Sequence, residues 1–345
     1  MPSEELGGRR EKILESIIRL YITTAVPVGS QIVARQFRPG LSSATIRNEM
    51  ANLAELGYIR KPHTSAGRVP TDKGYRYYVD YLMEAKRLTQ AQKERIAREY
   101  WRLPYEIDEI MAKTSKLLSS ITRQAAMVLI PRLKKSAFKR LELIPMSQGK
   151  VLTVWMTTSG LIKNRVLNLG QAIPESVLHR ICNLLNSELE GFAIDEIREH
   201  LLRRLKKEKG SLFYLIKRAL DIVSIGGLNN EEAKLYLEGR DYILDQPEFK
   251  DLDKVRLVMR ALEEKRELLE VLDEDLKGEG VKVHIGRENR FEDMWECSLV
   301  TSTYWIGEEA FGTLGILGPK RMEYSEMVVI VDHMAKVVGE VLSRR

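Results

Sequence analysis

The chain has 345 residues, of which 44% are hydrophobic and 30% are charged, as in an ordinary globular protein. We expect two or three domains at this length, and no apolar run approaches the roughly 18 to 20 residues that span a bilayer. The basic N-terminus is not followed by an apolar stretch, and the two cysteines, Cys182 and Cys297, lie far apart. These features exclude a secretory signal and a disulfide framework, and they favour a cytoplasmic protein with no membrane partner.

The positive charge of the chain is concentrated in its first quarter. Residues 1–87 hold 14 Lys or Arg against 9 Asp or Glu, whereas residues 88–345 hold 41 against 40. A basic segment beside a neutral body indicates a polyanionic partner, because neutralised phosphates release condensed counterions. A solvated basic surface without such a partner is the alternative that charge alone leaves open.

Three short helices are predicted near the N-terminus. Apolar residues at helical spacing predict a first helix over residues 9–24. A turn with proline and glycine follows, and Ser30 is expected to cap a second helix. Ser42 or Ser43 is expected to cap a third helix that ends near Gly57. Three helices separated by short turns are typical of a helix-turn-helix.

The third predicted helix has two different faces. Its apolar face carries Ile46, Met50 and Leu53. Its opposite face carries Ala44, Arg47, Asn48 and Ala51. In a major groove Arg47 could bond guanine and Asn48 adenine, while Ser43 could hold a phosphate. The alternative is a surface helix that carries a few polar residues and contacts no nucleic acid.

A two-stranded ribbon is predicted directly after this helix. Residues 58–61 and 68–70 form its strands, and residues 62–67 form the turn. Basic and hydroxyl side chains gather near its tip, at Lys61, His63, Thr64, Ser65 and Arg68. Such side chains suit the sugar-phosphate backbone or the minor groove. We interpret His63 as a polar tip residue and not as a metal ligand, since no second ligand lies near it.

A fourth helix is expected after the ribbon, with Thr71 as its cap. Its aromatic and apolar residues fall on one face, at Tyr75, Tyr78, Val79 and Leu82. The helical spacing favours core packing of these tyrosines over a platform for stacking nucleic-acid bases.

The rest of the chain alternates between helices and strands. Helices are predicted over residues 87–102, 105–122, 175–189, 194–207, 211–224, 252–276 and from 325 through 342. Strands are predicted over residues 125–131, 138–145, 151–157, 162–169, 235–244, 281–285, 297–305 and 313–317. The strands from 138 to 169 are joined by turns that contain glycine, so we expect antiparallel hairpins.

The N-terminal residues resemble a known family. The stretch LSSATIRNEMANLAELGYIRKPHTSAGRVPTDKGYRYYVDYL closely resembles the winged-helix domain of the HrcA family, the heat-inducible transcription repressors of bacteria. The upstream VPVGSQ and the distal GTLGILGPKRMEYSEMV are also similar to that family. The resemblance implies an α+β multidomain fold with a winged helix-turn-helix, a GAF-like α+β domain and an inserted α+β dimerisation domain. The boundaries that it implies are 1–90 for the winged helix, 91–135 and 231–345 for the GAF-like domain, and 136–230 for the insertion.

The same resemblance implies a function and a set of contacts. Members of the family bind double-stranded DNA at an inverted-repeat operator called CIRCE, they act as homodimers, and the chaperonin GroEL helps to keep them active. The DNA contacts carried over to this sequence are Ser43, Thr45, Arg47, Asn48, Lys61, His63, Thr64, Ser65 and Arg68. No catalytic residue, metal or cofactor is implied.

Enzymatic alternatives find little support in the sequence. No Walker loop, HExxH, G-x-S-x-G or CxxC motif is present, and the histidines are scattered at positions 63, 179, 200, 284 and 333. Gly312, Gly315 and Gly318 do not have dinucleotide-binding spacing, so we expect turns and tight strand packing there. Asp293 and Glu296 are expected at the surface, and no polar cluster indicates a small effector. The main alternative to a repressor is a protein-interaction scaffold, followed by a ligand-metabolising enzyme with a GAF-like core.

Overall fold

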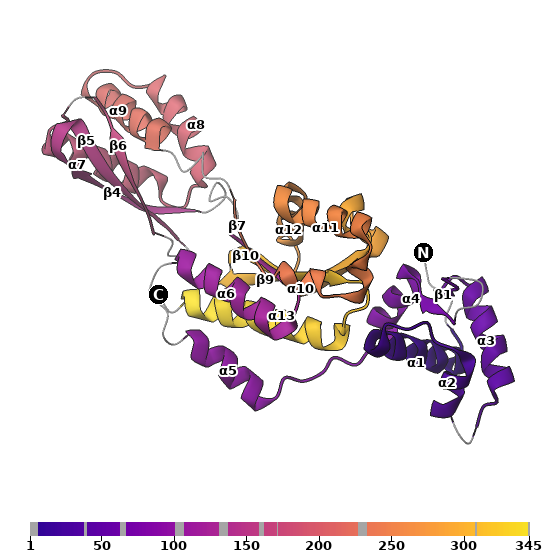
Figure 1. Cartoon of the computed structure of the whole chain (residues 1–345). Helices are drawn as coiled ribbons and strands as arrows, with labels where there is room; N and C mark the ends of the chain where they lie inside the picture. The colour runs from indigo at the N-terminus through magenta and orange to yellow at the C-terminus, as the bar shows by residue number, and fades with distance from the viewer. Residues whose placement is uncertain are drawn as a thin grey trace. The chain divides into compact units, whose positions relative to one another are not determined.

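The computed structural model mixes helices and strands, as the sequence predicts (Figure 1). It describes residues 6–37, 40–62, 67–100, 107–130, 137–158, 162–170, 172–226, 233–307 and 309–343. The chain divides into two compact units. The first unit comprises Met1–Leu129, Leu235–Trp305 and Ala310–Val338, and the second comprises Ile130–Lys234, Ile306–Glu309 and Gly339–Arg345. No helix in the described ranges has both the length and the apolar character that crossing a membrane requires.

The N-terminal part of the first unit is a small helical layer with a ribbon. Its elements are α1 (Gly8–Thr24), α2 (Ser30–Gln36), α3 (Ser43–Glu55), β1 (Ile59–Arg60), β2 (Val69–Pro70), α4 (Asp72–Tyr77) and the π-helical turn η1 (Tyr78–Leu82). Apolar side chains from every helix meet in one core that includes Ile13, Ile17, Ile46, Leu53 and Ile59. Tyr75 and Tyr78 are buried, which confirms that they are core residues, whereas Tyr81 is 63% exposed.

Two of the three predicted N-cap residues are confirmed. Ser42 caps α3, since its Oγ accepts a hydrogen bond from the backbone amide of Thr45 at 3.1 Å. Thr71 caps α4 in the same way, with the amide of Gly74 at 3.1 Å. The predicted cap of α2 is wrong, because Gly29 holds the cap position and Ser30 is the first helical residue.

A five-stranded sheet forms the centre of the first unit. Its strands are β3 (Ala125–Ile130), β7 (Lys234–Glu238), β8 (Val281–Ile285), β9 (Cys297–Ile306) and β10 (Glu309–Pro319), in the spatial order β7-β3-β10-β9-β8. Strand β3 is antiparallel to β10, and β8 is antiparallel to β9. The helices of this part are α5 (Gln90–Tyr100), α6 (Ile107–Thr122), α10 (Asp241–Leu244), α11 (Leu252–Glu264), α12 (Arg266–Asp275) and α13 (Tyr324–Ser343). Short 3-10 turns are η5 (Pro247–Lys250), η6 (Gly286–Glu288) and η7 (Glu292–Met294).

Two of the predicted elements are wrong, and the backbone conformation of one residue in each shows why. The strand predicted over residues 235–244 ends at Glu238, and a helical turn replaces its second half because Gly239 has a left-handed φ of +77°. The single helix predicted over residues 252–276 is two helices. Lys265 separates them with a φ of +53°, a conformation that interrupts a right-handed helix.

Two further predictions concern side chains of the first unit. The tight strand packing expected at the glycines of β10 is confirmed, since a Cβ at Gly315 would lie 2.6 Å from the carbonyl oxygen of Val300. The surface position expected for Asp293 is wrong. Asp293 is only 6% exposed, and its carboxylate accepts a hydrogen bond from Arg260 Nε at 2.6 Å.

The second unit has a three-stranded sheet with one face covered by helices. Its strands β4 (Phe138–Pro145), β5 (Lys150–Thr157) and β6 (Ile162–Asn168) are antiparallel in the order β4-β5-β6, as predicted. Its helices are α7 (Glu175–Leu189), α8 (Ile194–Leu205) and α9 (Ser211–Gly226), and η3 (Ser147–Gly149) is a short turn. Burial alternates along β5, so Val151 and Trp155 face the helices and the intervening residues face away.

Candidate DNA-binding surface

Helix α3 presents a polar face to the outside. Its inner face is fixed by Ile46, Met50 and Leu53, which are at most 4% exposed. Arg47 and Asn48 lie on the other side and are exposed. Neither side chain makes a hydrogen bond or an ion pair with any described residue. Two groups that bond base edges are therefore held on a well-packed helix and remain free to bind a partner.

Hydroxyl groups gather at the N-terminal end of α3. Ser42 Oγ lies 2.9 Å from Thr45 Oγ1, and Ser43 Oγ lies 3.3 Å from Ser30 Oγ. Thr45 and Ser43 are half-buried and already have hydroxyl partners, so they are less available than Arg47. Ser30 belongs to this cluster although the sequence does not indicate it, because a serine after a turn with proline and glycine is typical of a helix cap.

A third segment of the chain pairs with the two-stranded ribbon beside α3. Ile59 pairs with Pro70 and Arg60 with Val69. Val28 joins the edge, since its amide and carbonyl groups exchange hydrogen bonds of 2.8 Å with the backbone of Arg68. Gly67 permits this approach, because a Cβ there would lie 2.6 Å from the Val28 carbonyl. The turn between α1 and α2 is thereby fixed to the ribbon.

Two basic residues of the predicted set lie on the described part of the ribbon. Lys61 is exposed just after β1, and Arg68 is half-buried just before β2. Neither has an ionic partner among the described residues. The three other predicted contacts, His63, Thr64 and Ser65, lie outside the described residues.

Groups suited to a metal or to nucleophilic chemistry are not gathered in the described ranges. No cluster of His, Cys, Asp and Glu there could hold a metal ion. Cys182 and Cys297 are both buried and unpaired. Burial raises the pKa of the Cys182 thiol to about 11, which keeps it protonated near neutral pH.

Comparison with known proteins places these features in one class of protein. The heat-inducible transcription repressor HrcA of Desulfitobacterium hafniense is 38% identical to this chain over 343 residues, and the match covers 99% of each protein. The repressor of the same name from Pelotomaculum thermopropionicum is 39% identical over 340 residues, covering 99% of this chain and 98% of that protein. The class is therefore that of the transcription repressors.

A family match and a solved structure agree with these relatives. The family model described as HrcA protein C terminal domain matches residues 108–328. A crystal structure described as that of a hypothetical protein shares the fold with a TM-score of 0.59 at 25% identity, covering 99% of both chains. This chain belongs to the HrcA family of heat-inducible transcription repressors.

Proposed function

We propose that this repressor binds an inverted-repeat operator in double-stranded DNA, and that its N-terminal residues 1–90 act as a winged helix-turn-helix. Helix α3 would enter the major groove, and the ribbon would be the wing along the backbone. The observation that carries the proposal is the exposed face of α3, where Arg47 and Asn48 have no protein partner. An exposed Arg and Asn one residue apart suit guanine and adenine edges in adjacent base pairs.

Helix α3 would provide sequence specificity, and the ribbon would provide general affinity for DNA. Arg47→Ala should cost about 1–3 kcal/mol on the operator and much less on random DNA, because a bidentate base contact is lost. Lys61→Ala should weaken both complexes and reduce the salt slope by about one unit, since one phosphate contact is lost. Arg198 is exposed on α8 without an ionic partner in the described chain, so Arg198→Ala is the matched control.

A salt titration of the full chain on operator and random duplexes measures both effects. A steep fall of affinity with salt on both duplexes, with an offset that favours the operator, supports sequence-specific DNA binding. Salt-independent or absent DNA binding would favour the protein-interaction scaffold. Equal losses for Arg47→Ala on both duplexes would exclude Arg47 from base contacts.

We further propose that residues 136–230 are the dimerisation domain and that residues 91–135 and 231–345 form the GAF-like domain. The outward face of the three-stranded sheet supports a dimer. Ile144 pairs with Leu152, and Leu152 pairs with Val166, which gives an apolar row across all three strands. Ile144 and Val166 are 48% and 51% exposed. A second copy that covers this row would give two recognition helices related by two-fold symmetry, like an inverted repeat.

The operator is proposed to be the CIRCE element, and the chaperonin GroEL is proposed to sustain repression in the cytoplasm. Both parts rest on family membership. Footprinting of the CIRCE sequence with and without purified chaperonin tests them together. Protection that chaperonin strengthens supports the proposal, and protection that is indifferent to chaperonin would remove GroEL from it. Neither a cofactor nor a catalytic group is needed for this activity, so a chelator should leave operator binding unchanged.

A further inference from the structure

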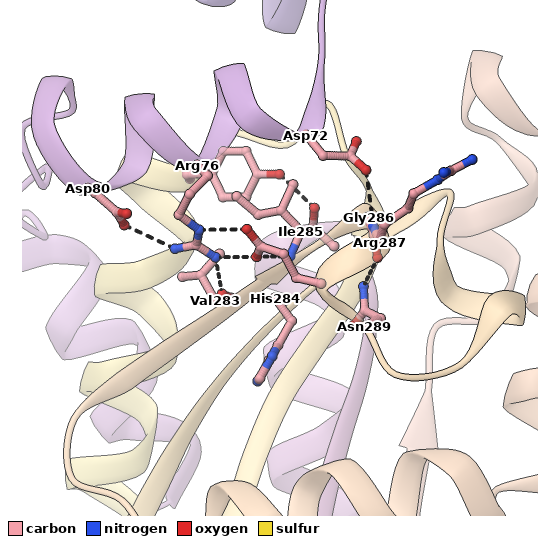
Figure 2. Close-up of polar contacts among 12 residues, drawn as sticks. Asp72, Arg76, Asp80, Val283, His284, Ile285, Gly286, Arg287 and Asn289 are labelled. Carbon is pink, nitrogen blue, oxygen red and sulfur yellow. Dashed lines mark hydrogen bonds and ion pairs between the residues drawn. The ribbon is translucent and has the colours of Figure 1, made fainter. Parts of the chain in front are cut away.

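Within the first unit, α4 is attached to the turn that follows β8 by a cluster of charged groups (Figure 2). We use the name α4 junction for the contacts that Asp72, Tyr75 and Arg76 of α4 and Ile22 of α1 make with residues 283–324. Arg76 Nε donates to Glu288 Oε1 at 2.9 Å, and its Nη2 contacts both Glu288 Oε2 and the carbonyl oxygen of Val283. Glu288 is itself held, because its Oε2 accepts the amide of Ile285 at 2.8 Å. A two-pronged guanidinium–carboxylate contact of this kind restricts rotation as well as distance.

A second attachment lies at the first residue of α4. Asp72 Oδ2 accepts the backbone amide of Arg287 at 3.0 Å, and its Oδ1 lies 3.0 Å from Lys320 Nζ. Gly286 lies directly against this carboxylate, and a Cβ at that position would be 2.3 Å from Asp72 Oδ2. The contact therefore requires glycine at residue 286.

A third set of contacts involves Arg321 and Tyr75. Arg321 Nη1 donates to the carbonyl oxygen of Ile22, near the end of α1, at 2.5 Å. The side chain of Arg321 is anchored in turn by the Glu248 carboxylate. The ring of Tyr75 is buried and packs on Tyr324 with 5.9 Å between the ring centroids. The junction thus combines charged contacts with an apolar contact.

Position in the chain connects the junction to the DNA-binding surface. Strand β2 ends at Pro70, and α4 begins at Asp72 after the single residue Thr71. The Thr71 hydroxyl donates to the carbonyl oxygen of Gly57 at 2.6 Å, close to the end of α3. A rotation of the ribbon or of α3 would therefore displace α4, and the contacts at Asp72, Arg76 and Ile22 oppose rotation about any one of them.

We propose that the α4 junction determines the half-site spacing of the operator, because it fixes the orientation of α3 relative to the five-stranded sheet. Asp72, Arg76, Gly286 and Glu288 are its positioning residues. The inference rests on the proposed function, since it presumes a dimer on an inverted repeat. One inserted base pair moves a half-site by about 3.4 Å and rotates it by about 35°. A flexibly linked DNA-binding segment would tolerate such changes, whereas a fixed one would not.

The test compares Gly286→Ala with Gly280→Ala in the full chain. Both glycines have left-handed backbones, with φ of +54° and +79°, so both substitutions strain the backbone. Only the Cβ at residue 286 meets Asp72, because the Cβ at residue 280 has nothing within 4 Å. The probe is the inverted-repeat duplex that the wild-type chain selects from random DNA, remade with one to five base pairs inserted between its half-sites. A duplex with a single half-site is measured alongside.

The wild type and Gly280→Ala should show a sharp optimum of spacing. Gly286→Ala should bind the single half-site as well as the wild type does, but its ratio of best to worst spacing should fall by about tenfold or more, as part of the tethering advantage is lost. Glu288→Gln keeps the shape of the side chain but removes its charge, and it should lower the same ratio by a smaller factor. A flat wild-type profile, or an unchanged profile in both junction variants, would overturn the inference. If the wild-type chain did not bind the single half-site, the result would instead contradict the proposed function.

Discussion

The two larger sheets of this protein, with five and three strands, differ in how completely their faces are covered. In the five-stranded sheet, β3 is buried along its whole length and β9 is buried over its first eight residues, which leaves these strands no face for a partner. In the three-stranded sheet, burial alternates along β5, and the face turned away from the helices keeps exposed apolar side chains. The central strands of the first sheet are covered within one chain, whereas the second sheet has the surface expected of a subunit interface.

The largest expected effect is in the buried strand β3 of the five-stranded sheet. Val128 in β3 is 0% exposed, so Val128→Asp would bury a carboxylate that has no partner and should lower the free energy of unfolding by more than about 4 kcal/mol. Chemical denaturation and soluble yield measure the loss. A variant that keeps wild-type stability would show that this sheet opens to solvent, and the contrast between the sheets would fail.

The same substitution in the three-stranded sheet should spare the fold and break the proposed dimer. Val166 in β6 is 51% exposed, so Val166→Asp should change the stability of the subunit by about 1 kcal/mol or less. Sedimentation should show monomers, and affinity for the inverted repeat should fall about 100-fold while half-site affinity stays. Ser187→Asp adds the same charge at an exposed position on α7 and should remain dimeric. A dimeric Val166→Asp would move the interface elsewhere.

A buried carboxylate makes the five-stranded sheet sensitive to acid. Burial alone would raise the pKa of Asp275, but hydrogen bonds from His284 and Thr301, with the charges of His284 and Lys282, lower that pKa below its ordinary value. A lowered folded-state pKa stabilises the fold above the unfolded-state pKa of about 4, and the contribution is lost as pH falls through the lowered value.

Asp275→Asn should therefore cost about 1–3 kcal/mol at neutral pH, and the difference from the wild type should shrink below about pH 4. Urea unfolding across this pH range measures it. Asp273 is exposed on the same helix and has no partner in the described chain, so Asp273→Asn should have little effect at any pH. A pH-independent cost for Asp275→Asn would assign its role to packing instead of charge.

The smallest expected effect is a lack of thiol reactivity. Cys182 in α7 and Cys297 in β9 are 5% and 0% exposed, and burial raises the pKa of both thiols. A disulfide reagent at pH 8 should label the denatured chain quickly and the native chain slowly. Cys182 should stay protected in Val166→Asp, because the helix-covered face of its sheet does not depend on the dimer. Rapid labelling there would show that the second unit unfolds without its partner.

The candidate site was largely predictable because it depends on local rules. A 100° helical repeat is enough to separate Ile46 and Met50 from Arg47 and Asn48, and the structure buries the first pair and exposes the second. The cap at Ser42 follows from one side chain and one nearby amide. The sequence could not assign the engaged hydroxyls of Ser43 and Thr45, since Ser30 reaches Ser43 only through the packing of α2 on α3.

Sequence alone determined the type and approximate bounds of most elements, because periodicity and turn residues act within a few positions of the chain. Tertiary structure decided the rest through contacts between residues far apart. Arg260 keeps Asp293 buried, and Asp72 meets Gly286 across more than two hundred residues. The strand order β7-β3-β10-β9-β8 also pairs segments from distant parts of the chain. Such contacts leave no periodic trace, since each depends on where the whole chain brings a second group.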